Sequence, residues 1–130
     1  MNCPLKVKLF IWQILHQSLP TSSFLFSKHI IPSPFCSLCG EYDDSNHWII
    51  QCKAFSEVRK AIHWITWDNI DFLSLICQSN QSIEHEISKI ACLLWHIWLA
   101  RNATIFRNAP ISTLGIIKAT ESMIHNHDLT

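Results

Sequence analysis

The chain has 130 residues, enough for one domain. Hydrophobic residues make up 48% of it and charged residues 15%, which predicts a folded core and excludes a disordered acidic or basic tail. Ten Lys and Arg balance ten Asp and Glu, so a strongly basic nucleic-acid binder of the histone type is excluded, whereas a local basic face is not. With only two glycines, the chain has no G-x-G-x-x-G motif, phosphate-binding loop or nucleophile elbow.

Residues 1–15 resemble a short secretory signal, because positive charge precedes an apolar run. Gln13 interrupts that run and no cleavage site with small residues follows it, so we expect a protein that is not secreted. The other strongly apolar segment, residues 90–100, is far shorter than the ~20 residues of a membrane span. The sequence therefore predicts an intracellular protein, cytoplasmic or nuclear, with no membrane partner.

The first half of the chain predicts helices on both sides of a loop. A helix over residues 5–17 has a broad apolar face formed by Leu5, Leu9, Phe10, Trp12, Ile14 and Leu15. Thr21 is a suitable N-cap for a short helix over residues 22–29, and two prolines then favour extended backbone at residues 31–34. A tight loop follows at residues 36–40. Asp44 or Ser45 caps a helix that carries residues 47–51, and residues 54–66 predict another.

The second half predicts a short helix over residues 67–77, a polar connector over 78–81, and then the strongest helix of the chain. Ser82 caps that helix, and its apolar stripe consists of Ile83, Ile87, Ile90, Leu94, Trp98 and Ile105. Residues 108–110 end it, a weaker helix follows over 112–124, and residues 125–130 are expected to fray. We predict an all-α fold: a small helical domain with one irregular zinc-binding loop insert.

The loop insert carries the pattern C-x2-C-G-x6-H-x4-C, formed by Cys36, Cys39, Gly40, His47 and Cys52. Two cysteines separated by two residues can present both sulfurs to one metal ion, and the glycine permits positive φ where the loop closes. Three cysteines and one histidine form a closed tetrahedral set that structural zinc uses. The sequence therefore predicts one structural Zn2+, and Lys53 is placed to offset part of the net charge of about −1 on the site.

Other interpretations of the cysteines are weaker. A C-x-x-C pair is also typical of thioredoxin-like redox sites, but those sites need a βαβ context that is missing here. A disulfide framework does not suit six irregularly spaced cysteines in a helix-rich chain. A catalytic zinc ion needs an open coordination position, which four good ligands do not leave. We expect Cys3, Cys77 and Cys92 to be unpaired, and His63 and His96 to be packed or half-exposed helix residues.

Tyr42, Asp43 and Asp44 resemble the Y-x-D-D sequence of reverse transcriptases but lack its spacer residue. We interpret the two aspartates as a solvated acidic turn that caps the following helix. On this interpretation, a double Asp43→Asn, Asp44→Asn variant keeps its fold and its zinc.

Further stretches of the chain form an ordered set with the cysteine motif. Residues 4–15 contain the pattern P-x-K-x-x-x-F-x-W, residues 19–21 are L-P-T, and residues 29–31 are H-I-I. Later in the chain, residues 95–106 match W-x-I-W-x-x-R-N-x-x-x-F. Together with Cys36, Cys39, His47 and Cys52, this set resembles the zinc-binding domain of the reverse transcriptases of non-LTR (LINE-type) retrotransposons, which are abundant in plant genomes.

The resemblance implies a non-catalytic module that follows the polymerase and holds template RNA or target DNA. It implies metal ligation by Cys36, Cys39, His47 and Cys52. We expect residues 1–66 to form the zinc-binding domain and residues 67–130 a helical C-terminal extension packed on it, with the last few residues frayed. The chain looks like an excised piece of such an element.

Two functions follow from these patterns. In the first, the module binds single-stranded RNA or DNA through Lys28, Lys53, Arg59 and Lys60, which flank the metal loop, and through base stacking on Trp48, with Trp64 and Phe55 as further candidates. For each of these aromatic residues, core packing is the role we favour over base stacking, because helical aromatic side chains usually face inward. In the second, zinc only stabilises the fold, and the apolar helix over residues 83–105 docks on a protein partner. A thiol redox enzyme is the least favoured hypothesis.

Overall fold

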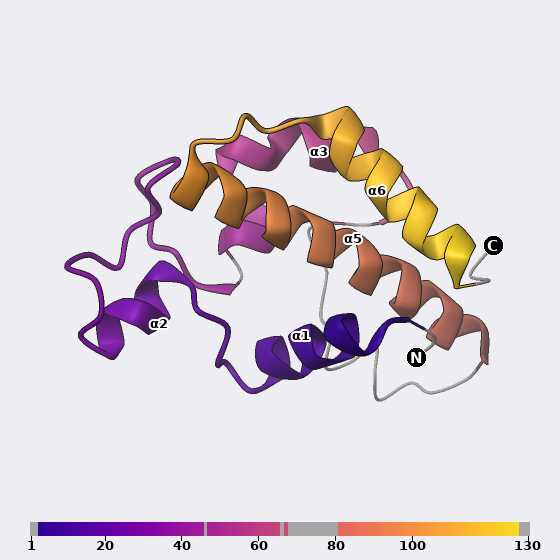
Figure 1. Ribbon diagram of the computed structural model, residues 1–130, viewed down its shortest axis with the longest axis horizontal. Helices are drawn as coiled ribbons and strands as arrows, with labels where there is room; N and C mark the ends of the chain where they lie inside the picture. The colour runs from indigo at the N-terminus through magenta and orange to yellow at the C-terminus, as the bar shows by residue number, and fades with distance from the viewer. Residues whose placement is uncertain (1–2, 46, 66, 68–80, 128–130) are drawn as a thin grey trace.

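One long helix organises the fold. The computed structural model describes residues 3–45, 47–65, 67 and 81–127. Helix α5 (Gln81–Arg107) runs through the centre, with α1 (Leu5–Leu15) along one side and α6 (Thr113–Asn126) and α3 (Ser56–Ala61) on the other (Figure 1). Helix α2 (Ser22–Ser27) lies at one end of the molecule. The described residues are mostly helical and contain no strand beyond an isolated bridge between Phe35 and Tyr42, so the all-α prediction is confirmed.

Helix α5 is buried on several sides because it lies between other helices. Ile87, Ile90, Leu94 and Trp98 of the predicted stripe are buried, and so are Ala91, Cys92, Leu93 and Ile97. The helix therefore buries its apolar surface within the chain, against α1 and α6. The predicted docking of residues 83–105 on a protein partner is therefore wrong for these four stripe residues, because they are buried inside the chain. In the described part of the chain, no helix combines the length and the apolar character needed to cross a bilayer.

Helix α1 buries only part of the apolar face that was predicted: Phe10, Ile14 and Leu15 of that face pack in or against the core. Val7, Phe10 and Ile11 face the core, whereas Leu5, Leu9 and Trp12 are exposed. The Phe10 ring lies 5.3 Å from the Trp95 ring and 5.9 Å from the Trp48 ring, between centroids. Because α1 is apolar nearly all round, its sequence did not indicate which side would meet α5.

Helices α1 and α2 end in the same way, through residues with positive φ. Gln17 (φ 53°) follows α1 and His29 (φ 60°) follows α2. In each case the N–H group of the next residue reaches back to the last turn: Ser18 donates to the carbonyl of Gln13 and Ile30 to that of Leu25, both at 2.9 Å. The positive-φ residues themselves donate to the carbonyls of Ile14 and Phe26. This is the Schellman arrangement, here formed without the usual glycine. It ends each helix two residues before its predicted limit.

The remaining helix boundaries agree in part with the sequence. Thr21 caps α2 as predicted, accepting a hydrogen bond from the Phe24 N–H group. Helix α3 is shorter than the predicted 54–66, since Ile62 has extended backbone. Helix α6 continues to Asn126, so residues 125 and 126 are helical rather than frayed. Helix α5 already includes Gln81, one residue before the predicted cap. The predicted helix over 67–77, apart from Trp67, and Cys77 lie outside the described residues.

A buried ion pair joins the metal loop to α5. Asp43 has no exposed surface, and its Oδ2 atom accepts hydrogen bonds from Nη2 of Arg101 and from the backbone N–H of Ser22, the latter at 2.7 Å. The Arg101 guanidinium also lies over the Trp98 ring, 4.6 Å from its centroid. The predicted solvated turn is therefore wrong for Asp43. Asp44 does act as a cap, since its Oδ1 atom accepts from the His47 N–H group at 2.8 Å.

We predict that Asp43→Asn lowers the free energy of unfolding by about 3–5 kcal/mol, because it leaves the buried Arg101 charge without a counter-charge. Asp44→Asn is the matched control and should cost less than about 1 kcal/mol, since asparagine caps helices as well as aspartate does. Urea unfolding followed by circular dichroism measures both. Equal stability of the two variants would contradict the structural role of the ion pair.

Candidate metal centre

The fold brings together the four residues of the predicted metal site. Ligand atoms of Cys36, Cys39, His47 and Cys52 all lie within 4.8 Å of one another. The Cys52 sulfur is 4.0 Å from that of Cys36 and 3.9 Å from that of Cys39, and His47 Nε2 is 3.2 Å from Cys39 Sγ. Ligands around a tetrahedral zinc ion with Zn–S bonds of ~2.3 Å stand about 3.8 Å apart, so these residues fit the ion.

A tight turn positions the first two cysteines. The Gly40 N–H group donates to the Cys36 carbonyl at 2.8 Å, and the Cys36 N–H group donates to the Glu41 carbonyl at 2.6 Å. Gly40 has φ of +85°, while a Cβ atom there would meet nothing within 4 Å. The glycine is therefore needed for its backbone conformation and not for space, as the sequence predicted.

The other two candidate ligands are His47, the first residue of a single turn of π-helix, η1 (His47–Gln51), and Cys52, which directly follows it. The Cys52 N–H group donates to the His47 carbonyl at 2.7 Å, which spans five residues and brings both side chains to the cluster. Trp48 points instead into the core, where its ring lies 5.2 Å from the Trp98 ring. The short helix η2 (Lys53–Phe55) follows and leads into α3. The π-helix thus divides adjacent residues between the metal cluster and the hydrophobic core.

Burial makes it unfavourable to deprotonate the cysteine thiols of the cluster when no cation is bound. The pKa of the Cys52 thiol is raised to about 12, chiefly by burial and in smaller part by the neighbouring sulfurs of Cys36 and Cys39. Burial also raises the pKa of Cys36, although backbone hydrogen bonds from Leu38 and Cys39 act in the opposite direction. A divalent cation that binds thiolates would offset this cost, because it neutralises the charges that burial disfavours.

Arg59 contacts the cluster through the backbone of Cys52. Its Nη2 atom donates to the Cys52 carbonyl at 2.6 Å, and Nη1 is buried without a hydrogen-bond partner in the described part of the chain. Burial lowers the pKa of Arg59, whereas the charge of a Cys52 thiolate would raise it. Trp67 holds the same turn of helix by donating from Nε1 to the Arg59 carbonyl at 3.0 Å. Arg59 is therefore positioned as the counter-charge that the sequence assigned to Lys53, which is exposed.

The predicted nucleic-acid contacts fall into two groups. Lys28, Lys53 and Lys60 are exposed, with Lys60 in a surface ion pair with Glu57. Trp48 is 1% exposed and Phe55 is fully buried, so neither ring is available to stack on a base. The favoured core-packing role is confirmed for both, and the assignment of Trp48 as a nucleic-acid contact is wrong. Trp64 is exposed. The sequence could not separate these aromatic residues, because each lies in a helix-like apolar context whose inner face depends on distant segments.

Among the described residues, the other cysteines and histidines do not belong to the cluster. Cys3 and Cys92 are buried and unpaired, in agreement with the sequence prediction. Burial raises the pKa of Cys92 to about 12, which is typical of an inert core thiol. His96 is half-buried, with Nδ1 2.8 Å from the Cys92 carbonyl, and His63 is exposed.

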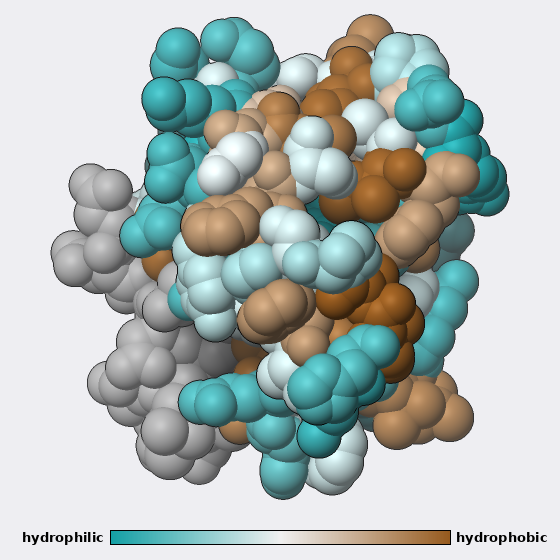
Figure 2. Space-filling model, turned by 90° about the vertical axis from the view of Figure 1, so that its left-hand side faces the viewer, coloured by the Kyte–Doolittle hydropathy of each residue, from teal (hydrophilic) through white to brown (hydrophobic). Residues whose placement is uncertain are grey.

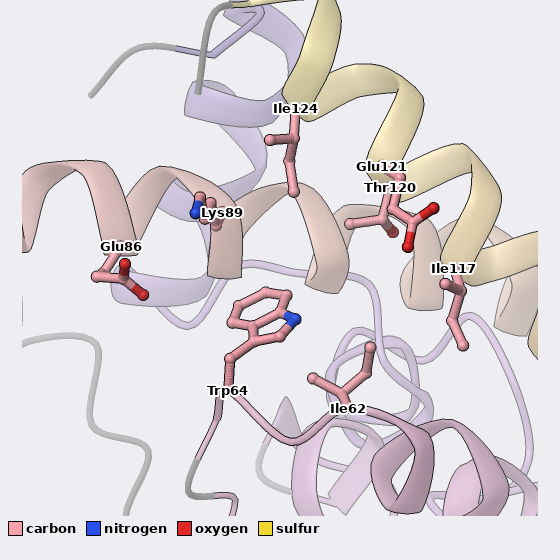
Figure 3. Close-up of a pocket in the computed structure, with 8 residues that line it drawn as sticks. All are labelled: Ile62, Trp64, Glu86, Lys89, Ile117, Thr120, Glu121 and Ile124. Carbon is pink, nitrogen blue, oxygen red and sulfur yellow. The ribbon is translucent and has the colours of Figure 1, made fainter. Parts of the chain in front are cut away.

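A half-open hollow of about 330 Å³ lies between the end of α3, α5 and α6 (Figure 3). Its lining consists of Ile62, Trp64, Glu86, Lys89, Ile117, Thr120, Glu121 and Ile124. The Thr120 hydroxyl donates to the Ile116 carbonyl at 2.8 Å, so it is occupied within its own helix. The described lining therefore offers no nucleophile paired with a base.

Comparison with known proteins agrees with the site. Residues 1–58 match the family model described as zinc-binding in reverse transcriptase. The matched segment contains all four residues of the cluster. Residues 1–58 are therefore similar to the zinc-binding domain of reverse transcriptases, and the resemblance predicted for this segment is confirmed. No curated protein and no solved structure matches the chain.

We predict that Cys39→Ser removes zinc and most of the helical signal, whereas Cys92→Ser keeps about one zinc per chain and loses only about 1–3 kcal/mol. The reason is that loss of a ligand also removes folding free energy, while a hydroxyl at Cys92 disturbs only core packing. Elemental analysis and circular dichroism of both variants measure the difference. Full zinc content in Cys39→Ser would contradict the ligand assignment.

We predict that Arg59→Gln weakens zinc binding by about tenfold, because it removes the positive charge beside the thiolates. Arg59→Lys should restore part of the affinity. The neighbouring variant Lys60→Gln, at an exposed position of the same helix, is the control and should leave zinc affinity unchanged. Competition with a chromophoric chelator measures all three, and equal affinities would exclude the charge-compensating role.

Proposed function

We propose that this chain is a non-catalytic zinc-binding module, derived from the reverse transcriptase of a plant non-LTR (LINE-type) retrotransposon, that contacts single-stranded RNA or DNA. The observation that carries the proposal is the cluster of Cys36, Cys39, His47 and Cys52 inside a segment that matches a reverse-transcriptase zinc-binding family. The four residues would hold one structural Zn2+. A complete ligand set leaves no open position for a reactive water molecule.

Three observations support a non-catalytic role. Asp43 is committed to Arg101, and Asp44 caps η1, so this pair of aspartates does not present free carboxylates to a catalytic metal ion. The metal cluster has a full set of protein ligands. The described hollow beside α6 lacks a paired nucleophile and base.

The proposed division of the chain places the zinc-binding domain at residues 1–66 and a helical extension at 67–130, packed on it. Contacts of α5 with α1 and with η1 support this packing, as does the ion pair between Asp43 and Arg101. We propose that the module works inside the cell, in the cytoplasm or the nucleus, where thiolates stay reduced and available to zinc.

Exposed lysines support the nucleic-acid contact. Lys28, Lys53 and Lys60 are available to phosphates, whereas Arg59 is already engaged at Cys52. Because the chain has no net charge, we expect moderate affinity that falls steeply as salt is added.

A second candidate function is docking of a protein partner, with zinc serving the fold alone. One observation favours it: Phe26, Ile30, Phe35 and Tyr42 are exposed in α2 and in the loops around the metal turn. Figure 2 shows the end of the molecule where these segments lie, with hydrophobic residues gathered between hydrophilic ones. This end of the molecule, and not α5, would then be the docking surface.

We predict that the zinc-loaded chain binds a fluorescent single-stranded RNA at low salt and that the logarithm of affinity falls linearly with the logarithm of salt concentration. A slope of about −2 corresponds to three neutralised phosphates on a single strand. Fluorescence anisotropy at several salt concentrations measures it. Absence of binding at low salt would favour the docking function instead.

A further inference from the structure

Helix α1 carries a row of exposed side chains that the predicted site does not include. Leu5, Leu9 and Trp12 are 71%, 56% and 54% exposed, and the exposed His16 continues the row. Their spacings of four, three and four residues place them on one face of the helix. We call these four residues the α1 stripe. Val7, Phe10 and Ile11 anchor the opposite face in the core, so the helix holds the stripe firmly.

The outer end of the stripe is a preformed aromatic stack. The rings of Trp12 and His16 lie 4.0 Å apart between centroids and are inclined by 22°. His16 Nδ1 lies 2.9 Å from the Trp12 carbonyl, which fixes the orientation of the imidazole over the indole. Two exposed rings held in parallel offer a flat surface that loses little conformational freedom when another planar group stacks on it.

The charge around the stripe is entirely positive along α1. Lys6 and Lys8 are exposed, and Lys8 lies one helical turn before Trp12. Residues 1–40 contain Lys6, Lys8 and Lys28 and neither aspartate nor glutamate. Among the side chains of α5 that the structure describes, His96, whose pKa is lowered by burial, is close enough to Lys6 for the lysine charge to lower the pKa of the imidazole as well. The stripe therefore suits a partner that has flat apolar groups and negative charge.

We propose that the α1 stripe is a binding site for single-stranded nucleic acid, in which an unpaired base stacks on the Trp12–His16 pair while Lys6 and Lys8 contact phosphates. Leu5 and Leu9 extend the apolar surface for the next nucleotide. The proposal rests on the proposed function and names a site for it that differs from the metal loop.

Charge separates this site from the other exposed tryptophan. Trp64 is 44% exposed, but the hollow that it shares contains two carboxylates, Glu86 and Glu121, against one cation, Lys89, so its charged groups sum to a negative charge that disfavours phosphates. Trp64 is thus a matched control, because its exposure is similar to that of Trp12 but the charged side chains around it are mostly negative.

The test compares binding of a labelled single-stranded RNA by the zinc-loaded full chain and its variants. Trp12→Ala should weaken binding by about tenfold, and His16→Ala by a smaller factor, while Trp64→Ala leaves it unchanged. A double Lys6→Gln, Lys8→Gln variant should reduce the salt slope by about 1.4, at about 0.7 per phosphate contact. Zinc content and circular dichroism should stay constant, because these side chains lie outside the core.

Each other outcome overturns the inference in a distinguishable way. If the wild type binds RNA and the α1 variants bind equally well, the stripe is not the site and the proposed function stands. If the wild type does not bind RNA even at low salt, the inference and the nucleic-acid function both fail. Loss of binding to vesicles of anionic phospholipid in Trp12→Ala, with RNA binding unchanged, would assign the stripe to a membrane surface instead.

Discussion

The ion pair between Asp43 and Arg101 is the constraint on which the arrangement of this protein depends. A carboxylate and a guanidinium buried this deeply are tolerable only together, so the loop that carries the candidate metal ligands must meet α5 at one position and in one orientation. The same carboxylate holds the start of α2 through Ser22. The metal loop, the start of α2 and α5 are therefore joined at the buried carboxylate of Asp43.

This constraint connects residues 95–106 with the segment that matches the zinc-binding family. Residues 95–106 contain Arg101, which pairs with the metal loop, and Trp95 and Trp98, which pack around Phe10 of α1. The long helix thus supplies part of the core on which the metal loop rests. We infer that residues 1–58 need α5 for their stability, although the family match ends before that helix.

The positive charges of the chain are divided between inner and outer positions. Arg59 and Arg101 are bound to the backbone of a ligand residue and to a buried carboxylate, so they serve the fold and the metal centre. Lysines occupy the outer positions, including Lys6 and Lys8 beside the α1 stripe. Arginine suits the inner positions, because its fork of donors meets several acceptors at once, whereas lysine keeps its ammonium group hydrated at the surface.

Sequence alone determined the features that arise within a few residues: the helical class, the Thr21 cap, a second cap at Asp44 or Ser45, the positive φ of Gly40 and the spacing of the four cluster residues. Each depends on local backbone geometry, which neighbouring residues dictate. Only the tertiary structure decided that Asp43 is buried, that Trp48 belongs to the core and that Trp12 does not. Those outcomes depend on partners far along the chain: Arg101 lies 58 positions from Asp43, and α5 selects which side of α1 is covered. Periodicity shows that a helix has apolar faces, but burial is set by the surface it meets.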